Sequence, residues 1–389
     1  MPRRSDPIYL DHNAGAPLRP VARESMIEVL SDAGNASSVH TDGRRARGRI
    51  ESAREKVARL CSAQNRAVTF VSGGTEGNMM ALTPVWQVQG APVYLEKLFR
   101  SAVEHPSVVT GGRFAVANQC VVPVDSDGVI QIDALKDSVC DTEPSLISVM
   151  AANNETGVIQ PLAEIGAIAQ EYGHFFHVDA VQAAGRIKID MDAWQADALT
   201  ISAHKLGGPQ GAGAVVVRST AKTPSALMVG GGQENWRRGG TENVAAIAGF
   251  GIAADAALEE TADLRHLLEL KTRLEEGLQA HCPTTIFFGI KAERLANTCC
   301  FAVPGISAET ALIALDLERV SISSGSACSS GKVSVSHVLT AMGVDEELAR
   351  CALRISMGWD TTKTDIEEFL DVWPGIVDRL NPNARHKAA

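Results

Sequence analysis

The sequence predicts an α/β protein whose main sheet is mostly parallel, with helices on both sides. From about residue 67 to residue 217, short apolar runs alternate with amphipathic or polar segments. Runs this short, ended by polar or glycine residues, are typical of strands buried on both faces, and their alternation with helices favours a parallel sheet. The predicted strands are AVTFV (67–71), VVPV (121–124), LISVM (146–150), FFHV (175–178), ALTIS (198–202) and GAVVV (213–217).

Helical patterns lie between several of these strands, as in segments 76–87 and 162–172. After Thr241, a long stretch with few helix breakers (242–281) predicts helices that connect to a second domain. In that domain we expect strands near 285–288, 298–303 and 352–357, and helices near 308–317 and 364–380.

Charge and hydropathy exclude two classes of partner. The 389 residues include 36 Lys and Arg against 46 Asp and Glu, a net charge of −10, which disfavours binding to nucleic acid. No stretch approaches the roughly 20 apolar residues of a membrane span, and the first residues do not form a signal peptide. We therefore expect a soluble, cytoplasmic protein.

The eight cysteines form no CxxC pair and no Cys/His cluster with zinc-finger spacing, so no metal site is expected. In a cytoplasmic chain of this size a disulfide framework is improbable, and a free cysteine is most often a small buried side chain. We expect seven of the eight to be reduced core residues.

Ligands of open α/β sheets bind beyond the carboxyl ends of the strands, where three features follow one another. The first is the glycine-rich turn 72–78, which is either a phosphate cradle at a helix start or a simple turn capped by Thr75. No Gly-Lys-Ser/Thr follows, so a Walker A loop is excluded. The second is Asp179, which either caps the next helix or pairs with a cation such as the protonated pyridine nitrogen of pyridoxal phosphate (PLP).

The third feature is Lys205, at the end of the strand 198–202. A lysine set among small residues at this edge can be desolvated and can then form a Schiff base, although most lysines are simply solvated. Ser202 and His204 are placed to add phosphate contacts. The ordered set of phosphate turn, aspartate and lysine favours a functional interpretation of all three.

Eight segments resemble those of the cysteine desulfurases of the NifS and IscS type, and they recur in order along almost the whole chain. They are VSGGTEGNMMAL, VEHPSV, MAANNETGVIQP, HVDAVQAAG, SAHKLGGPQGAGAVVV, GGGQENWRRGGTEN, SSGSACSSG and LRISMG. The resemblance implies the PLP-dependent transferase fold of type I, with a seven-stranded, mostly parallel sheet. It also implies a large PLP-binding domain (15–255) and a smaller α+β domain (1–14 and 256–389).

Carried over residue by residue, the resemblance implies a complete PLP site. Lys205 would hold the cofactor, Asp179 would pair with its pyridine nitrogen, and His105 would stack on its ring. Arg354 would bind the substrate carboxylate, with Asn154 nearby. Gln182 and Asn154 would lie near the phenolic oxygen of the cofactor. The phosphate group of PLP would be held by Gly74, Thr75, Ser202 and His204. In a homodimer, Thr241 would reach the PLP phosphate bound in the neighbouring subunit.

Cys328 is the exceptional cysteine, because it lies in SSGSACSSG (323–331), whose composition predicts a mobile loop (about 323–335) with a reactive thiol. The resemblance implies that L-cysteine is converted to L-alanine and that its sulfur passes to Cys328 as a persulfide. The sulfur would then go to an acceptor or scaffold protein, with iron–sulfur cluster assembly as the expected destination.

Two departures from the family pattern, Val335 and Trp359, bear on the loop's reach and the substrate entrance. Other hypotheses are a selenocysteine lyase or an aminotransferase of the same fold, and a catalytically dead scaffold subunit. A transaminase has no need of Cys328, and a non-catalytic protein has no need of Lys205, Asp179, His105, Cys328 and Arg354 together.

Overall fold

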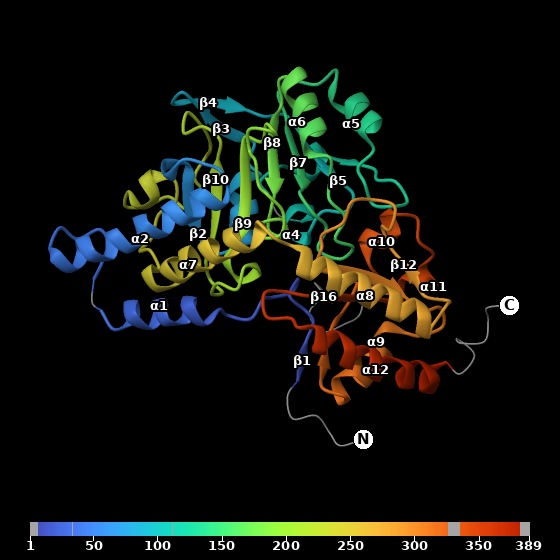
Figure 1. Ribbon diagram of the computed structural model, residues 1–389. Helices are drawn as coiled ribbons and strands as arrows, with labels where there is room; N and C mark the ends of the chain where they lie inside the picture. Colours follow the sequence, from blue (N-terminus) through green and yellow to red (C-terminus); the bar gives the residue numbers. More distant parts are fainter. Residues whose placement is uncertain (1–6, 33, 111, 326–334, 382–389) are drawn as a thin grey trace.

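The largest element of the computed structural model, which describes residues 7–32, 34–110, 112–325 and 335–381, is a seven-stranded sheet (Figure 1). Its order is β2-β10-β9-β8-β7-β5-β6; β10 runs antiparallel to both neighbours, and the other neighbouring pairs are parallel. The prediction of a seven-stranded, mostly parallel sheet is confirmed. The strands are β2 (Val68–Val71), β5 (Leu98–Ser101), β6 (Gln119–Val122), β7 (Leu146–Met150), β8 (Phe175–Asp179), β9 (Ala198–Ser202) and β10 (Gly213–Val217).

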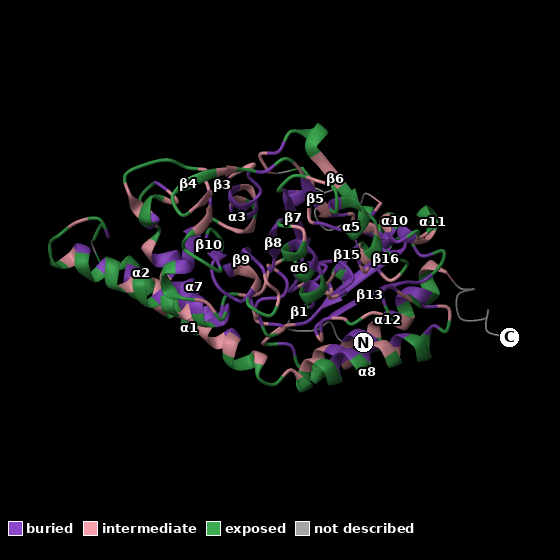
Figure 2. Cartoon of the chain, turned by 90° about the horizontal axis from the view of Figure 1, so that it is seen from above, coloured by how far each residue is buried: buried purple, intermediate pink, exposed green. Residues whose placement is uncertain are grey.

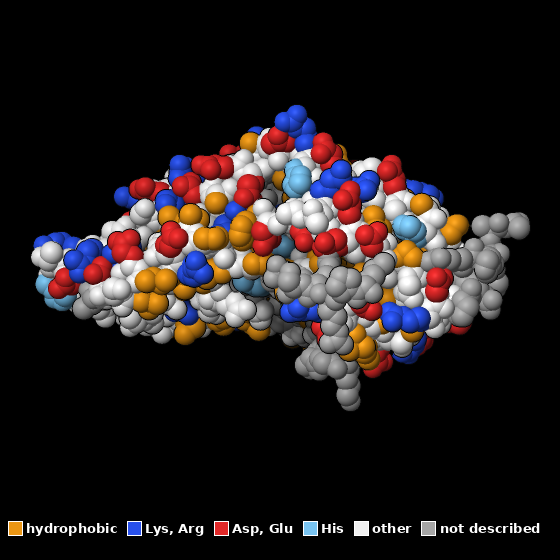
Figure 3. All heavy atoms as spheres, turned by 60° about the horizontal axis from the view of Figure 1, so that its bottom comes forward, with side chains coloured by type: hydrophobic (Ala, Val, Ile, Leu, Met, Phe, Trp, Pro, Cys, Tyr) orange, Lys and Arg blue, Asp and Glu red, His pale blue; other side chains and the backbone are white. Residues whose placement is uncertain are grey.

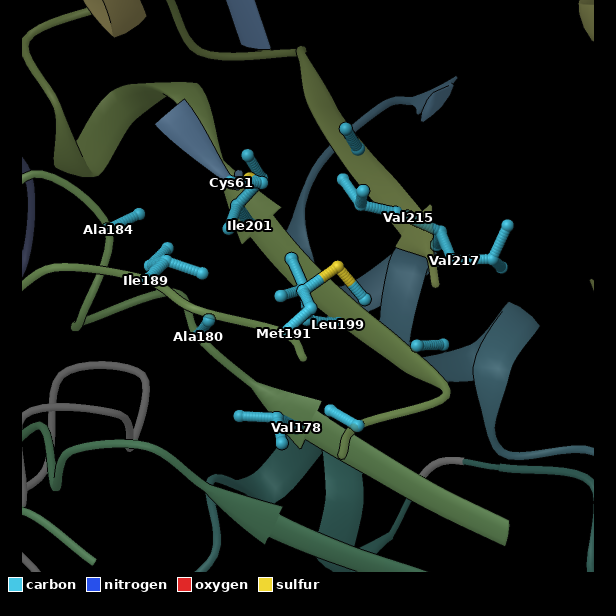
Figure 4. Packing of buried hydrophobic residues seen from close by; sticks show 14 of the residues in the cluster. Cys61, Val178, Ala180, Ala184, Ile189, Met191, Leu199, Ile201, Val215 and Val217 are labelled. Atoms are coloured by element: carbon cyan, nitrogen blue, oxygen red, sulfur yellow. The ribbon is translucent and has the colours of Figure 1, made fainter. Parts of the chain in front are cut away.

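Both faces of the central strands are buried. Alternate side chains of a strand point to opposite faces, and in β9 Thr200 faces Gly77 of the helix α3 (Gly74–Ala81). Leu199 and Ile201 face the other way and pack with Cys61 and Met191, as Figure 4 shows. This double burial explains why the runs are apolar throughout.

Helices surround the sheet, and their outward sides form much of the exposed surface in Figure 2. The helices α1 and α2 both pack on α7, and α6 packs on β8. A small three-stranded sheet, β11-β3-β4, stands beside the main one. The elements are α1 (Pro20–Leu30), α2 (Thr41–Leu60), β3 (Val85–Val88), β4 (Ala91–Tyr94), α4 (Pro106–Val109), α5 (Ile132–Val139), α6 (Leu162–Glu171), β11 (Lys222–Pro224) and α7 (Val244–Thr261).

Two details of the predicted elements were wrong. The helix expected over 76–87 ends at Ala81, and residues 85–88 form strand β3. Pro84 explains the break, since the residue before a proline is disfavoured in a helix. The strand expected over 121–124 ends at Val122, before Pro123, and is an edge strand with a half-exposed Val121 rather than a strand buried on both faces.

The C-terminal part has its own sheet and core. Its four strands are in the order β12-β13-β16-β15, and β1 of the N-terminus pairs in parallel with β14. Phe301, Phe369 and Trp373 pack together in this second core. The elements are β1 (Ile8–Tyr9), α8 (Arg265–His281), β12 (Ile286–Phe287), β13 (Thr298–Ala302), α9 (Ala308–Leu317), β14 (Val320–Ser321), β15 (Ser323–Ser324), α10 (His337–Ala341), α11 (Glu346–Ala349), β16 (Ala352–Ser356) and α12 (Lys363–Leu380).

The cysteines follow the prediction in part. Five are buried, namely Cys61, Cys282, Cys299, Cys300 and Cys351. Burial raises the pKa of the Cys61 and Cys300 thiols to about 12, so both are inert. The expectation of seven buried thiols was wrong for Cys120, which is half-buried on the edge strand β6, and for Cys140, which is exposed at the C-terminal end of α5.

Within the described ranges, no helix is both long enough and apolar enough to cross a membrane. On the face shown in Figure 3, basic and acidic side chains are interspersed. That face therefore carries no broad area of a single charge.

Candidate active site

A cavity of about 310 Å³ lies where β7, β8 and β9 end, since the last residues of these strands, Met150, Asp179 and Ser202, all line it. Ten of the predicted site residues line the same cavity. They are Gly74, Thr75, His105, Asn154, Asp179, Gln182, Ser202, His204, Lys205 and Arg354.

The glycine-rich turn forms one wall of the cavity. The helix α3 begins at Gly74, and its N-cap Gly73 has no side chain with which to cap the first amides. A Cβ on Gly74 would lie 2.9 Å from Val181 Cγ2, so the turn approaches the segment after β8 closely. Across the turn, Ser202 Oγ and His204 Nδ1 are 2.8 Å apart. Burial, then the charge of Lys205, lowers the pKa of His204 to about 4, so its ring is neutral at pH 7.

A chain of hydrogen bonds runs from Asp179 to His105. Asn78 donates from Nδ2 to Asp179 Oδ2 at 2.7 Å and to Ser107 Oγ at 2.9 Å, and Ser107 Oγ lies 2.8 Å from His105 Nδ1. The Ser107 amide donates to the same Nδ1 at 3.1 Å, so this nitrogen carries no proton and Nε2 carries it in the neutral ring. Burial lowers the pKa of His105 despite the opposing charge of Asp179, which favours the neutral ring.

The carboxylate of Asp179 is buried, and its two hydrogen-bond partners are neutral. Oδ2 accepts from Asn78, and Oδ1 accepts from the Val181 amide at 3.0 Å. The side chain is 5% exposed and faces the cavity. A buried charge is costly, and the two donors described here are neutral, so a cationic ligand atom in the cavity would be stabilised at this carboxylate.

Lys205 meets a segment that sequence reasoning did not assign to the site. Its Nζ donates to the carbonyl oxygens of Asn13 and, at 2.8 Å, of Ala14. Gln182 Nε2 donates to the same Asn13 oxygen at 3.0 Å. We call residues 8–17 the N-terminal strap; it is attached to the C-terminal part by the β1–β14 pairing and by the hydrogen bond from Asn13 N to Ser356 Oγ.

Two buried arginines border the other side of the site. Arg354, on β16, donates from NH1 to the Asn154 carbonyl at 2.8 Å and from NH2 to Asp11 Oδ1 at 2.7 Å. Arg186 donates to the side-chain oxygen of Gln182. Burial, reinforced by the nearby charge of Arg354, lowers the pKa of Arg186 to about 9.

Two predicted residues are not among those that line the cavity. Thr241 is exposed and lines a separate cavity of about 210 Å³, next to Ser72 at the end of β2. Cys328 lies outside the described residues. The departure Trp359 also lies away from the main cavity: its ring packs 5.2 Å from the Arg19 guanidinium, and its Nε1 donates to the Pro17 carbonyl at 3.2 Å.

Comparison with known proteins places these observations in a family. The model of the aminotransferase class-V family matches residues 8–369. The chain is 39% identical over 385 residues to a cysteine desulfurase IscS from Dictyoglomus turgidum, covering 98% of this chain and 97% of that one. It is also 39% identical over 381 residues to an IscS-like cysteine desulfurase from Mycobacterium tuberculosis, covering 95% of this chain and 96% of that one.

Comparison with solved structures leads to the same family. The structure of a NifS-like protein from Rickettsia africae matches with a TM-score of 0.86 and 35% identity, covering 96% of this chain and 99% of that one. A structure described as SspA in complex with cysteine matches with a TM-score of 0.72 and 27% identity, covering 90% of this chain and 98% of that one. The chain therefore belongs to the aminotransferase class-V family and, within it, to the cysteine desulfurases of the IscS and NifS type.

Proposed function

We propose that this chain is a PLP-dependent cysteine desulfurase that converts L-cysteine to L-alanine and carries the sulfur away as a persulfide on Cys328. The observation that carries the proposal is the meeting of Lys205, Asp179 and the start of α3 in one cavity of about 310 Å³. The names of the relatives, and the cysteine complex of SspA, support the substrate.

The residues of the cavity fit PLP at both ends of that molecule. Asp179 offers a buried carboxylate to the pyridine nitrogen, and Lys205 offers a primary amine to the aldehyde carbon. The uncapped start of α3, with Thr75 and Ser202 beside it, suits the phosphate group. Bound PLP supplies an electron sink for the pair released when a bond to the substrate's α-carbon breaks.

The side chains would share the remaining work. Arg354 binds the carboxylate of cysteine, a task for which a guanidinium fork is suited. Lys205 Nζ takes the α-proton, and the two strap carbonyls that accept its hydrogen bonds fix its position. His105, with its proton on Nε2, lines the cavity and would stack on the pyridine ring.

Sulfur transfer requires a second nucleophile. The Cys328 thiolate attacks the sulfur of the substrate, an S–S bond forms, and the C–S bond breaks with its electron pair remaining on carbon. That carbon is protonated, Lys205 Nζ returns the proton to the α-carbon, and the product leaves as alanine, while Cys328 keeps the persulfide. An acceptor thiol then takes the outer sulfur, and we propose that this acceptor is a scaffold protein of iron–sulfur cluster assembly, in line with the IscS name of the relatives.

We further propose a homodimer in which Thr241 contacts the phosphate in the neighbouring subunit. In this chain Thr241 is exposed and outside the main cavity, and the nearby Val229 and Trp236 are apolar and exposed by 90% and 75%. Light scattering measures the assembly state. Mixed dimers of Lys205→Ala and Thr241→Ala chains would regain one intact site, whereas an absence of recovery would contradict the shared site.

The activity is tested by anaerobic incubation with L-cysteine, measuring alanine and sulfide. Cys328→Ala is expected to abolish alanine formation, and the exposed Cys140→Ala is the matched control with wild-type activity. Alanine formation that is unaffected in Cys328→Ala would overturn the persulfide role. Strong preference for selenocysteine, or amino transfer to a keto acid, would identify the alternative activities.

The cofactor is tested separately by absorbance. Purified protein is expected to be yellow and to lose this colour on borohydride treatment, whereas Lys205→Ala should retain no borohydride-trapped cofactor. Asp179→Asn keeps an oxygen that can accept from Asn78 but removes the charge. It is expected to reduce turnover at least roughly a hundredfold, the scale of losing one preorganised electrostatic group.

A further inference from the structure

We propose that Asp11 is a positioning residue that fixes the guanidinium group of Arg354 for the carboxylate of the amino-acid substrate. This inference rests on the proposed function, because it takes Arg354 as the group that binds the substrate carboxylate. Asp11 belongs to the N-terminal strap and lies 343 residues from Arg354 in the sequence.

Arg354 needs a partner of this kind because of where it lies. It is 1% exposed, on a strand with β13 on one side and β15 on the other. A buried charge is costly unless it is paired and hydrogen-bonded. Arg354 NH2 lies 2.7 Å from Asp11 Oδ1. Among the described residues, this is the carboxylate that forms an ion pair with the guanidinium.

The guanidinium still has donors to offer. Of its five N–H groups, one is donated to the Asn154 carbonyl and one to Asp11, and Nε has no partner among the described residues. Because Nε is buried, the second N–H of NH1 and the second N–H of NH2 are the two groups left for a two-point contact with an incoming carboxylate. Arg354 lines the cavity and Asp11 does not, so Asp11 acts through Arg354 rather than on the substrate.

Asp11 is itself held in place by backbone contacts. It forms an isolated parallel bridge with Ser356, two residues beyond Arg354 on the same chain segment. The neighbouring His12 amide donates to the Ser356 carbonyl at 3.1 Å, and Tyr9 donates its hydroxyl to the Asp11 carbonyl at 3.2 Å. The backbone that carries the Asp11 carboxylate is therefore held in place next to Arg354.

The charge of Asp11 offsets the burial of the Arg354 charge in the folded protein, but its effect on substrate binding comes from the place of its oxygen. A second carboxylate near the guanidinium repels the substrate carboxylate, so charge alone would weaken substrate binding. An asparagine at this position keeps an acceptor oxygen at the same distance along the side chain, whereas a glutamate keeps the charge but moves the oxygen by one methylene group. Asp11→Asn and Asp11→Glu therefore separate the effect of the oxygen's position on substrate binding from the effect of its charge.

The experiment uses the full-length holoenzyme with Asp11→Ala, Asp11→Asn and Asp11→Glu. Asp11→Ala and Asp11→Glu are expected to raise KM for L-cysteine about tenfold, the scale of one charge-assisted hydrogen bond, with kcat within about twofold. Asp11→Asn is expected to stay near wild type. Calorimetric titration adds a readout without turnover, because L-alanine and ethylamine differ only by the carboxylate. Asp11→Ala and Asp11→Glu should weaken the binding of L-alanine and leave that of ethylamine unchanged.

Asp360→Asn is the matched control, since Asp360 pairs with His12 of the strap at 3.2 Å but does not line the cavity. The inference is overturned if Asp11→Ala leaves KM unchanged or lowers it, or if ethylamine binding weakens as much as L-alanine binding. Should Asp11→Ala fail to fold, tighter L-alanine binding by Asp11→Glu than by Asp11→Asn overturns it. A wild-type holoenzyme that forms no alanine from cysteine contradicts the proposed function instead.

Discussion

Among single residues near the cavity, Glu155 has a carboxyl group whose chemistry is altered by its surroundings. Its side chain is 3% exposed, and burial raises its pKa to about 7, although the Ser336 hydroxyl donates to Oε2 and the charge of Arg354 opposes the rise. In an unfolded chain the same group would titrate near 4.5. The folded protein therefore holds a proton here that the unfolded chain has lost, and folding is penalised at higher pH.

This difference predicts a pH dependence of stability. A raised pKa in the folded state contributes stability below pH 4.5, and this contribution is lost as the pH rises to about 7. Glu155→Gln keeps the hydrogen-bonding shape but cannot ionise. Relative to wild type, the free energy of unfolding of the variant should rise by about 3 kcal/mol between pH 4.5 and pH 8, as measured by urea denaturation.

Glu171 is exposed, so Glu171→Gln is the control for this measurement. The difference between its free energy of unfolding and that of wild type should not change between pH 4.5 and pH 8. Parallel pH curves for wild type and Glu155→Gln would show that Glu155 is already ionised in the folded protein at pH 5.

At the scale of elements, the position of α3 depends on the small size of Gly77. A Cβ at this position would lie 2.6 Å from Thr200 Cγ2 on β9 and 3.4 Å from Val215 on β10. The helix can therefore lie directly on the sheet, and its first turn meets the cavity. An alanine would be favoured by helix propensity but would have no space.

Gly77→Ala is expected to destabilise the protein by about 1–3 kcal/mol and to weaken PLP retention, since α3 must move away from β9. Gly48→Ala in α2 provides the comparison, because no atom lies within 4 Å of its added Cβ; it should stabilise by about 0.5–1 kcal/mol. Both are measured by chemical denaturation. Adding Thr200→Ser, which removes the clashing methyl group, should restore part of the loss; an unaltered Gly77→Ala protein would contradict this packing.

Much of the element order could be predicted, because buried parallel strands have a simple composition. The apolar runs of β7, β8, β9 and β10 match the observed strands closely. The strand β5 was not predicted, because Arg100 interrupts its apolar run, although the strand pairs with both β6 and β7. Taking Pro84 and Pro123 into account would have improved the predicted ends of α3 and β6.

The site was less predictable where partners come from distant segments. Asp179 and Lys205 follow apolar runs, so their position at the edge of the sheet could be argued from the sequence. Asn78 lies one helical turn after Gly74, and its side chain could have been placed on the cavity side by that spacing alone. The strap carbonyls of Asn13 and Ala14 leave no such signal, because every residue has a carbonyl group.

At the scale of the whole molecule, Asn13 connects the part of the chain that holds the main sheet with the C-terminal part. Its backbone oxygen accepts from Lys205 and Gln182, while its side chain donates to the Asn154 carbonyl at 3.2 Å and to Thr298 Oγ1 at 3.0 Å. The side-chain oxygen also accepts from Asn297 at 3.2 Å. One buried amide thus joins the main sheet, the strap and β13.

Asn13→Ala is expected to lower the free energy of unfolding by about 2 kcal/mol, because buried polar partners lose their contacts. Turnover should fall as well, since the position of Lys205 Nζ depends on the same strap. Denaturation and steady-state kinetics measure the two effects, with the exposed Asn118→Ala as control. A stable, fully active Asn13→Ala would show that the strap is held by its backbone alone.

The pairing of β1 with β14 has a consequence for biosynthesis. Ile8 emerges from the ribosome first, but its partner Val320 is made more than 300 residues later. At typical rates of about 5–20 residues per second, the strap waits tens of seconds for its place in the fold. The carbonyls that hold Lys205 therefore take their place in the site only after Val320 has been made, and a nascent chain can complete its catalytic centre only after Arg354 has followed.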